Sequence, residues 1–109
     1  MSIIMNLFYK GENKNAVKFA EEMESSGIAD RIRHVEGNEG YDYFYSMKDP
    51  ETVLLIDAWK DQAALDRHHA SELMNEIMKL REKYDLHMEA KRYIPDDQGI
   101  TGADKKFVR

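Results

Sequence analysis

Two segments of this chain are apolar on both sides of an extended backbone, and this feature narrows the possible folds more than any other. Ile3 to Tyr9 (IIMNLFY) contains one polar residue, Asn6, and Thr52 to Trp59 (TVLLIDAW) is β-branched and nearly all apolar. Successive side chains of a strand point to opposite faces. Each segment therefore predicts a strand that is covered on both faces.

The rest of the chain predicts helices and two further strands. Expected helices span residues 13–25, 62–69 and 72–83, and expected strands span residues 31–47 and 86–94. Asp61 and Ser71 are predicted N-caps of the second and third helices. Gly27 is a predicted end of the first helix. Gly37 and Gly40 indicate a bulge or sharp bend inside the second strand region.

The order strand, helix, strand, strand, helices, strand is that of the βαββαβ unit. It predicts an α+β, ferredoxin-like domain over residues 1–95, with a four-stranded antiparallel sheet and helices on one face. A second sheet from another copy of the chain would cover the other face. Residues 96–109 form a polar tail, and its Phe107 and Val108 either pack on the domain or on a dimer partner, or remain unpacked as chain ends often do.

Composition excludes several classes of chemistry. The chain has no cysteine, which removes disulfides, thiolate nucleophiles and cysteine-based metal sites. Its net charge is -5 with no basic stripe, so nucleic acid is not an expected partner.

No apolar run approaches the roughly 20 residues that cross a bilayer, and the start does not resemble a signal peptide, so a cytoplasmic protein is expected. The histidines lack metal-ligand spacing, and no metal site is expected.

Residues 40–71 carry the motifs of a known family. The motifs follow one another along the chain: a strand that begins at Gly40, an Asp49-Pro50 turn, a strand that ends in Trp59-Lys60-Asp61, and the pattern A-L-x-x-H-x-x-S. This arrangement resembles the antibiotic biosynthesis monooxygenase (ABM) family, over roughly residues 3–94. The resemblance implies a dimeric α+β barrel, with the sheets packed together and a pocket between helices and sheet in each subunit. Members include cofactor-independent oxygenases of quinols and polyketides, haem-degrading enzymes and an isomerase.

His68 is the first candidate catalytic residue, because it matches the histidine of the family pattern. A neutral imidazole with a pKa near 6.5 accepts a proton from a phenol or enol at neutral pH. The resulting anion can pass an electron to O₂. The alternative is a structural histidine that binds carbonyls at the end of its helix. His69 lies about 100° further around the helix and is expected on the surface.

Asn6 is the second candidate catalytic residue, as a hydrogen-bonding group that orients the substrate. It shares a strand face with Ile4 and Phe8, and Phe8 is an expected substrate contact. A buried amide needs partners, so Asn6 binds either a substrate oxygen or a neighbouring strand. Haem-degrading and polyketide-oxidising members similarly carry an asparagine at this strand position.

Four more residues are expected to contact the substrate. Trp59 shares a strand face with Asp57 and is interpreted mainly as a packing anchor. Asp57 either orients a base or forms an ion pair with Arg92, and the ion pair is favoured. Met74 and Met78 form either an adaptable apolar wall of the pocket or ordinary core.

Two further patterns bear on the site. Tyr41, Tyr43 and Tyr45 lie on one strand face and either line a pocket or form the dimer interface, which is the favoured interpretation. Haem-degrading relatives place a tryptophan at the position of His68 and an iron-binding histidine at the position of Met78. Haem degradation is therefore not expected.

Together these features predict a homodimeric monooxygenase that needs no cofactor and oxidises a small aromatic or quinol-like compound with O₂. An isomerase or other proton-transfer enzyme of the same fold is one alternative. A non-catalytic protein that binds a small molecule is the other.

Overall fold

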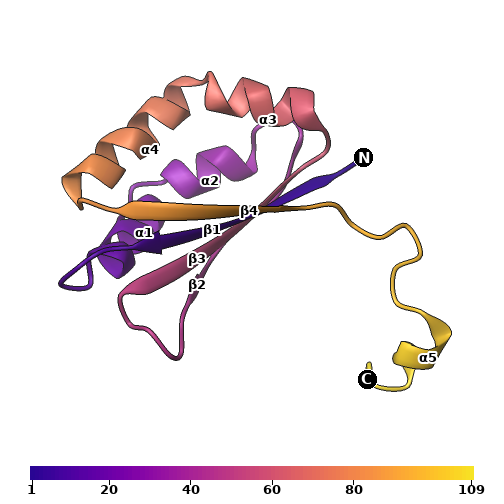
Figure 1. The fold of residues 1–109 in the computed structure, drawn as a ribbon. Coiled ribbons are helices and arrows are strands. Elements are labelled where there is room, and N and C mark those ends of the chain that lie inside the picture. Colours follow the sequence, from indigo (N-terminus) through magenta and orange to yellow (C-terminus); the bar gives the residue numbers. More distant parts are fainter.

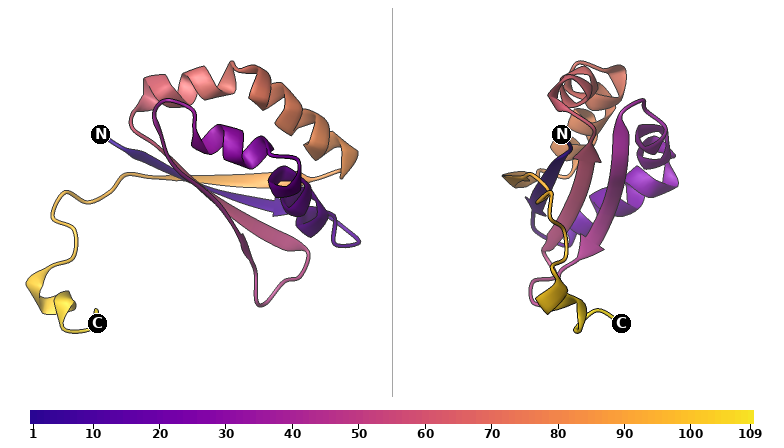
Figure 2. Two further views of the ribbon diagram at one scale, coloured as in Figure 1. Left: turned by 180° about the vertical axis from the view of Figure 1, so that it is seen from behind. Right: turned by 90° about the vertical axis from the view of Figure 1, so that its right-hand side faces the viewer.

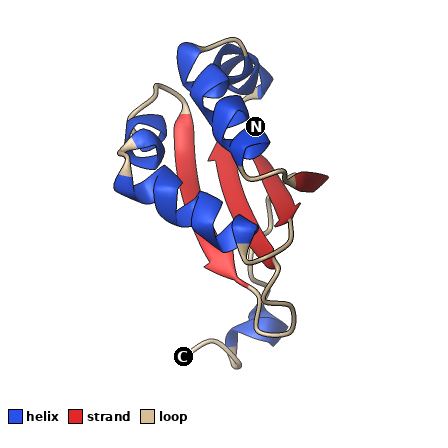
Figure 3. Ribbon diagram, turned by 90° about the vertical axis from the view of Figure 1, so that its left-hand side faces the viewer, coloured by secondary structure: helices blue, strands red, loops and turns tan.

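The structure, a computed structural model that describes residues 1–109, contains one four-stranded antiparallel sheet in the order β2-β3-β1-β4 with helices on one face (Figures 1 and 3). The elements are β1 (Ile3–Lys10), α1 (Asn15–Ser25), α2 (Ile28–Arg33), β2 (Asn38–Tyr45), β3 (Thr52–Trp59), α3 (Gln62–His69), α4 (Glu72–Lys83), β4 (His87–Tyr93) and α5 (Gly102–Lys105). The predicted α+β ferredoxin-like fold is confirmed. None of these helices has the length and apolar character needed to cross a membrane.

The two predicted N-caps hold α3 and α4 at their starts. The Asp61 carboxylate accepts a hydrogen bond from the Ala64 N–H at 2.8 Å, and the Ser71 hydroxyl accepts one from the Met74 N–H at 3.3 Å. These bonds satisfy N–H groups that have no partner inside the first turn. The helix α1 starts differently: its N-cap, Lys14, makes no capping hydrogen bond with its side chain, and the Asn15 side chain donates to the Tyr84 carbonyl at 3.1 Å.

The second strand is shorter than predicted. Residues Ile28–Arg33 form the helix α2, whose Ile28, Ala29 and Ile32 are buried. Six residues make less than two helical turns, which is too short for a clear periodic pattern. The predicted bulge is confirmed: the pairing of β2 with β3 shifts register between Asn38 and Gly40, and Gly37 adopts a positive φ of 90°.

The sheet has two apolar faces in different surroundings. We call the side packed against the helices the helix face; in β1 and β3 it carries Ile3, Met5, Leu7, Tyr9, Val53, Leu55, Asp57 and Trp59. We call the other side the open face; in the same strands it carries Ile4, Asn6, Phe8, Leu54, Ile56 and Ala58. No helix covers the open face, and these six residues are half-buried (Figures 1 and 3).

The tyrosine stripe of β2 belongs to the helix face. Tyr41 is only 2% exposed, and the Tyr43 ring meets Phe19 of α1 edge-on at a centroid distance of 6.2 Å. Tyr45 lies near the end of the strand and is 68% exposed. The favoured interpretation of this stripe as a dimer interface is therefore wrong, and Phe44 is the aromatic residue of β2 on the open face.

The tail leaves β4 and lies away from the rest of the domain (Figures 1 and 2). Every residue from 91 to 109 is exposed, and the tail contains only the four-residue helix α5. Packing of the tail on its own domain, one of the three arrangements considered, is not found in the structure, and within the single chain the tail is unpacked. Packing on a dimer partner stays a prediction.

Candidate functional site

His68 lies in the last turn of α3, inside the layer between helices and sheet. Because Asp61 starts α3 directly after β3, the helix carries His68 back over the end of that strand. The side chain is 4% exposed, and its ring stacks on the Trp59 indole at a centroid distance of 4.7 Å and an angle of 23°. His68 is thus fixed between a helix and the largest fully buried side chain of the protein.

Trp59 also binds Asp57, its neighbour on the helix face. The indole N–H donates to one carboxylate oxygen of Asp57 at 2.9 Å, and both side chains are buried. The predicted ion pair between Asp57 and Arg92 is wrong: Arg92, on the exposed edge strand, donates to the Gln62 side chain at 2.7 Å. The structure therefore brings Asp57, Trp59 and His68 together as one buried group.

Three buried polar atoms in this layer have no hydrogen-bond partner within the chain. They are Oδ1 of Asp57, Nδ1 of His68 and Nε of Arg81. An unpaired buried polar atom costs about 1–3 kcal/mol, so such atoms are uncommon and typically have a functional or solvent-related explanation. The Asp57 carboxylate and the His68 imidazole offer hydrogen-bond acceptors to a polar ligand. The Arg81 N–H is a donor elsewhere in the layer, beside Tyr9.

The burial of His68 and Asp57 shifts their protonation in opposite directions. Desolvation lowers the pKa of His68 to about 4, and the neighbouring His69 acts in the same direction. Desolvation raises the pKa of Asp57, opposed by the Trp59 N–H and by His69. At neutral pH His68 is therefore uncharged. The same desolvation makes it a weaker base than a free imidazole, so a proton that it accepts needs a partner that stabilises the new charge.

Tyr9 and Arg81 extend the polar group along the sheet. The Arg81 guanidinium carbon lies 5.7 Å from the centroid of the buried Tyr9 ring. Burial raises the pKa of Tyr9 to about 12, Arg81 lowers it and Asp57 raises it. Sequence reasoning missed both residues. The available signal was the place of Arg81, four positions after the buried Ile77 on the same side of α4.

Asn6 and Phe8 lie on the wrong face of the sheet to join this group. Asn6 pairs with Ile56 and Phe8 with Leu54, all on the open face, whereas Ile3 pairs with Trp59 beneath the helices. His68 and Asn6 are therefore separated by the sheet itself. The expectation that they line one pocket with Phe8 does not hold for this chain.

The two methionines of α4 differ in position. Met74 is half-buried and packs against the core, as a wall residue would. Met78 is 46% exposed and touches Arg81 through its sulfur, 3.4 Å from Nη1. It lines a shallow concavity of about 310 Å³ with Arg81 and Leu86, so Met78 belongs to the rim of the layer and not to its interior.

The layer between the helices and the sheet is exposed to solvent along the edge strand β4. Met88, Ala90 and Arg92 point to the helix face in register with β1, yet every residue of β4 is exposed. The helices therefore stop short of this edge strand. Met5 and Leu7 of β1, next to this edge, are half-buried.

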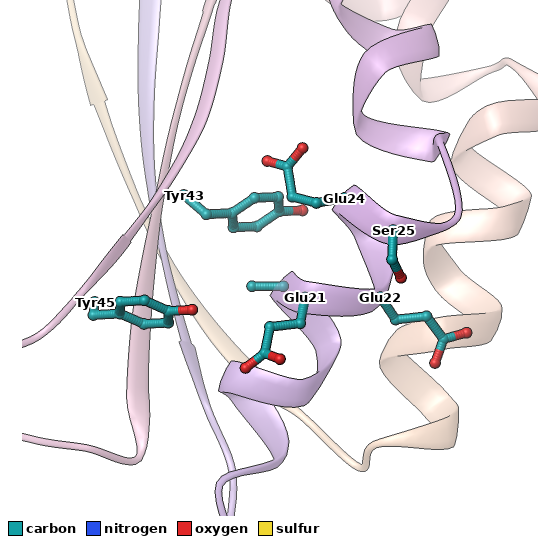
Figure 4. A pocket seen from close by; sticks show the side chains of 7 residues that line it. Glu21, Glu22, Glu24, Ser25, Tyr43 and Tyr45 are labelled. Atoms are coloured by element: carbon teal, nitrogen blue, oxygen red, sulfur yellow. The ribbon is translucent and has the colours of Figure 1, made fainter.

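The largest concavity lies elsewhere, between α1 and β2 (Figure 4). It measures about 760 Å³, and Figure 4 shows Glu21, Glu22, Glu24, Tyr43 and Tyr45 around it. The protein itself neutralises two of these carboxylates: Glu22 binds Lys83 and Tyr84, and Glu24 binds Arg33. Asp57, Trp59 and His68 line neither this concavity nor the one beside Met78.

Chemically, the buried group can take a proton from a bound molecule. The neutral imidazole of His68 would supply the base. The Arg81 guanidinium lies over Tyr9, at the far end of β1 from the Ile3–Trp59 pair, and does not face His68. No three histidine, aspartate or glutamate side chains lie close enough together to hold a metal ion.

Comparison with known proteins gives one family. The sequence profile described as "Antibiotic biosynthesis monooxygenase" matches residues 2–80. YcnE of Bacillus subtilis, named as a proposed monooxygenase, is 28% identical over 67 residues, which cover 62% of this chain and 68% of that protein.

Solved structures show the same fold at low sequence identity. A proposed antibiotic biosynthesis monooxygenase from Nitrosomonas europaea superposes with a TM-score of 0.77 at 13% identity, covering 90% of this chain and 93% of that one. A second, from Deinococcus radiodurans, gives a TM-score of 0.75 at 14% identity, covering 87% and 93%. The profile match, which spans most of the chain, together with this shared fold, shows that the protein belongs to the antibiotic biosynthesis monooxygenase family.

Proposed function

We propose that this protein is a monooxygenase that oxidises a small aromatic or quinol-like compound with O₂, without a bound metal or flavin. One observation carries the proposal: a buried, neutral His68 with an unpaired Nδ1 stacks on the indole that holds Asp57. Membership in the ABM family and the name given to YcnE support the same class of reaction.

His68 begins the reaction by taking a proton from a phenolic or enolic O–H of the substrate. The electron-rich anion gives one electron to O₂, and the resulting radical and superoxide combine to form a C–O bond. The proton on His68 returns to this peroxide, which loses water to leave a carbonyl group. One oxygen atom ends in the product and the other in water, and the substrate supplies both electrons.

Asp57 provides a further partner for the substrate. Its Oδ1 accepts a hydrogen bond from a substrate hydroxyl. This atom is buried and unpaired within the chain. Trp59 keeps the His68 ring in place, and the half-buried Met74 contacts the apolar part of the substrate.

The open face supports a homodimer as the working form. Its centre is apolar, with Phe8, Leu54 and Ile56, and charged residues such as Asp42 and Lys91 flank it on the outer strands. An apolar centre with a polar rim is the usual anatomy of a protein interface. In this arrangement Asn6 lies in the dimer interface and is not a catalytic residue.

Oxygen consumption tests the proposed reaction. Purified protein treated with a chelator and freed of flavin is mixed with a panel of hydroquinones and anthrones in an oxygen electrode cell. We expect protein-dependent O₂ uptake with one of these compounds, and mass spectrometry with ¹⁸O₂ should place one labelled atom in the product.

Anaerobic assays separate the alternatives. Turnover that continues without O₂ would replace the monooxygenase with an isomerase that uses the same base. Binding of a panel compound that survives His68→Gln, with no turnover in air, would indicate a non-catalytic binding protein.

A further inference from the structure

The C-terminal arm, which we define as residues 94–109, is an apolar surface without a partner in its own chain. Its four large apolar side chains are each more than half exposed: Ile94, Ile100, Phe107 and Val108. Its hydrogen bonds are local, such as those from the Gly99 N–H to the Asp96 carbonyl at 3.0 Å and from the Thr101 hydroxyl to Asp104 at 3.0 Å.

The arm extends well beyond the domain. The radius of gyration of the chain is 15.3 Å, whereas a compact chain of this length has about 13 Å. In Figure 1 the helices lie above the sheet and the arm runs below it, on the side of the open face. The arm and the open face are therefore two uncovered apolar surfaces on the same side of the molecule.

The open face is a modest area for an interface between two copies of the chain. Four strands about 4.8 Å apart and about 25 Å long present a projected area of roughly 480 Å². A standard interface takes about 800 Å² of accessible surface from each partner, a measure that exceeds the projected area of the same face. The apolar arm lies on that side and adds exposed apolar surface to such an interface.

We propose that the C-terminal arm packs on a second copy of this chain, with Phe107 and Val108 as its main contacts. Because two identical subunits meet through a two-fold axis, each arm contacts the other subunit and the contact forms twice. This inference rests on the homodimer proposed above, but it does not depend on the reaction or on His68.

Magnetic resonance on mixed dimers tests where the arm lies. Because the chain has no cysteine, Lys106→Cys gives a single site for a nitroxide label next to Phe107. The nitroxide-labelled variant is prepared without ¹⁵N. It is mixed with wild-type protein that is enriched in ¹⁵N and carries no nitroxide. We expect line broadening of amides in the ¹⁵N-enriched chain, because the label on one copy lies against the other.

Sedimentation measures the contribution of the arm to dimer stability. In the full chain, Phe107→Ser with Val108→Ser removes the apolar contacts, and Lys105→Ser with Lys106→Ser is the matched control. We expect the first pair to raise the dimer dissociation constant about tenfold to a hundredfold and the control to change it by less than about twofold.

Three results would overturn the inference: a wild-type protein that is monomeric at all concentrations, a mixed dimer without intermolecular broadening, or equal dissociation constants for the two double variants. In a second sample the nitroxide-labelled chain itself is ¹⁵N-enriched; broadening in that sample and not in the mixed one would show instead that the arm packs on its own domain. A dimer with an exchanged arm that oxidises no compound would leave this inference intact and contradict only the proposed function.

Discussion

The two faces of the sheet are similar in sequence but different in what covers them. In β3 the helix face carries Val53 and Leu55, which are fully buried, and the open face carries Leu54 and Ile56, which are half-buried. The helix face is completed by the chain itself. The open face has the same apolar character without a cover, which indicates that its stabilising partner comes from outside the chain.

The same comparison explains the two polar residues inside apolar strands. Asp57 lies under the helices, where low polarity shifts its pKa and leaves one oxygen unpaired. Asn6 lies on the open face, half-exposed and away from His68. The chemistry that a polar strand residue can take part in therefore depends on what packs against its face of the sheet.

The largest expected effect comes from placing the same charge on each face of β3. Leu55→Asp puts a carboxylate into the buried layer, and its cost is comparable to the whole free energy of unfolding, about 5–15 kcal/mol. Ile56→Asp affects the open face only. We expect circular dichroism to show an unfolded Leu55→Asp protein and a folded Ile56→Asp protein that sediments as a monomer. Equal behaviour of the two variants would remove the distinction between the faces.

The second effect compares the two adjacent histidines of α3. His68→Gln removes the proposed base, and we expect a loss of about 10²–10⁴-fold in kcat/KM for O₂ uptake. His69→Gln changes an exposed side chain next to it and should retain activity within about threefold of the wild type. A His68→Gln protein with full activity would assign the base to another residue.

The third effect is the acid dependence of stability. The pKa of His68 falls from 6.5 to about 4 on folding, so between these values the unfolded chain binds a proton that the folded chain does not. The free energy of unfolding therefore decreases as the pH falls through this window, by on the order of 3 kcal/mol for this group.

Denaturant titrations of wild type and His68→Gln at pH 7, 5.5 and 4.5 isolate the histidine contribution. Burial raises the pKa of Asp57, so this residue acts in the opposite direction and favours the folded state in acid. It is present in both proteins and largely cancels in their difference. A difference that stays constant with pH would contradict the buried neutral state of His68.

The smallest effect concerns the bond between Trp59 and Asp57. Trp59→Phe keeps an aromatic ring but removes the N–H, which leaves the buried carboxylate without its donor and should destabilise the protein by about 2 kcal/mol. Adding Asp57→Leu removes the unpaired group and should recover most of the loss. Thermal denaturation measures both steps, and a double variant no more stable than Trp59→Phe alone would argue against the carboxylate as the cause.

Local sequence patterns predicted the helices and strands well where a side chain determines the conformation of the backbone next to it. Asp61 and Ser71 cap their helices as expected, and β3 has its predicted bounds. The first helix ends at Ser25, as expected, and buries Phe19 and Met23. The helix α2 was not predicted because its six residues carry too little periodicity.

The candidate site was predicted only in part, for a physical reason. Alternation along β1 shows that Met5 and Asn6 point to opposite faces, but both faces of the strand are apolar. The pattern alone therefore could not decide which face the helices cover. Asn6 and Phe8 were placed with His68 on the basis of family resemblance, and the packing of α3 and α4 places them on the other side.

The sequence by itself determined the order of the strands and the longer helices, the caps of α3 and α4, and the need for an additional cover on the sheet, because these depend on neighbouring residues and on the period of the apolar pattern. Only the tertiary structure decided that Asp57, Trp59 and His68 form one buried group. That grouping depends on how α3 and α4 pack back across β1 and β3. Strand pairing and helix packing join positions far apart in the chain, and no local pattern specifies them.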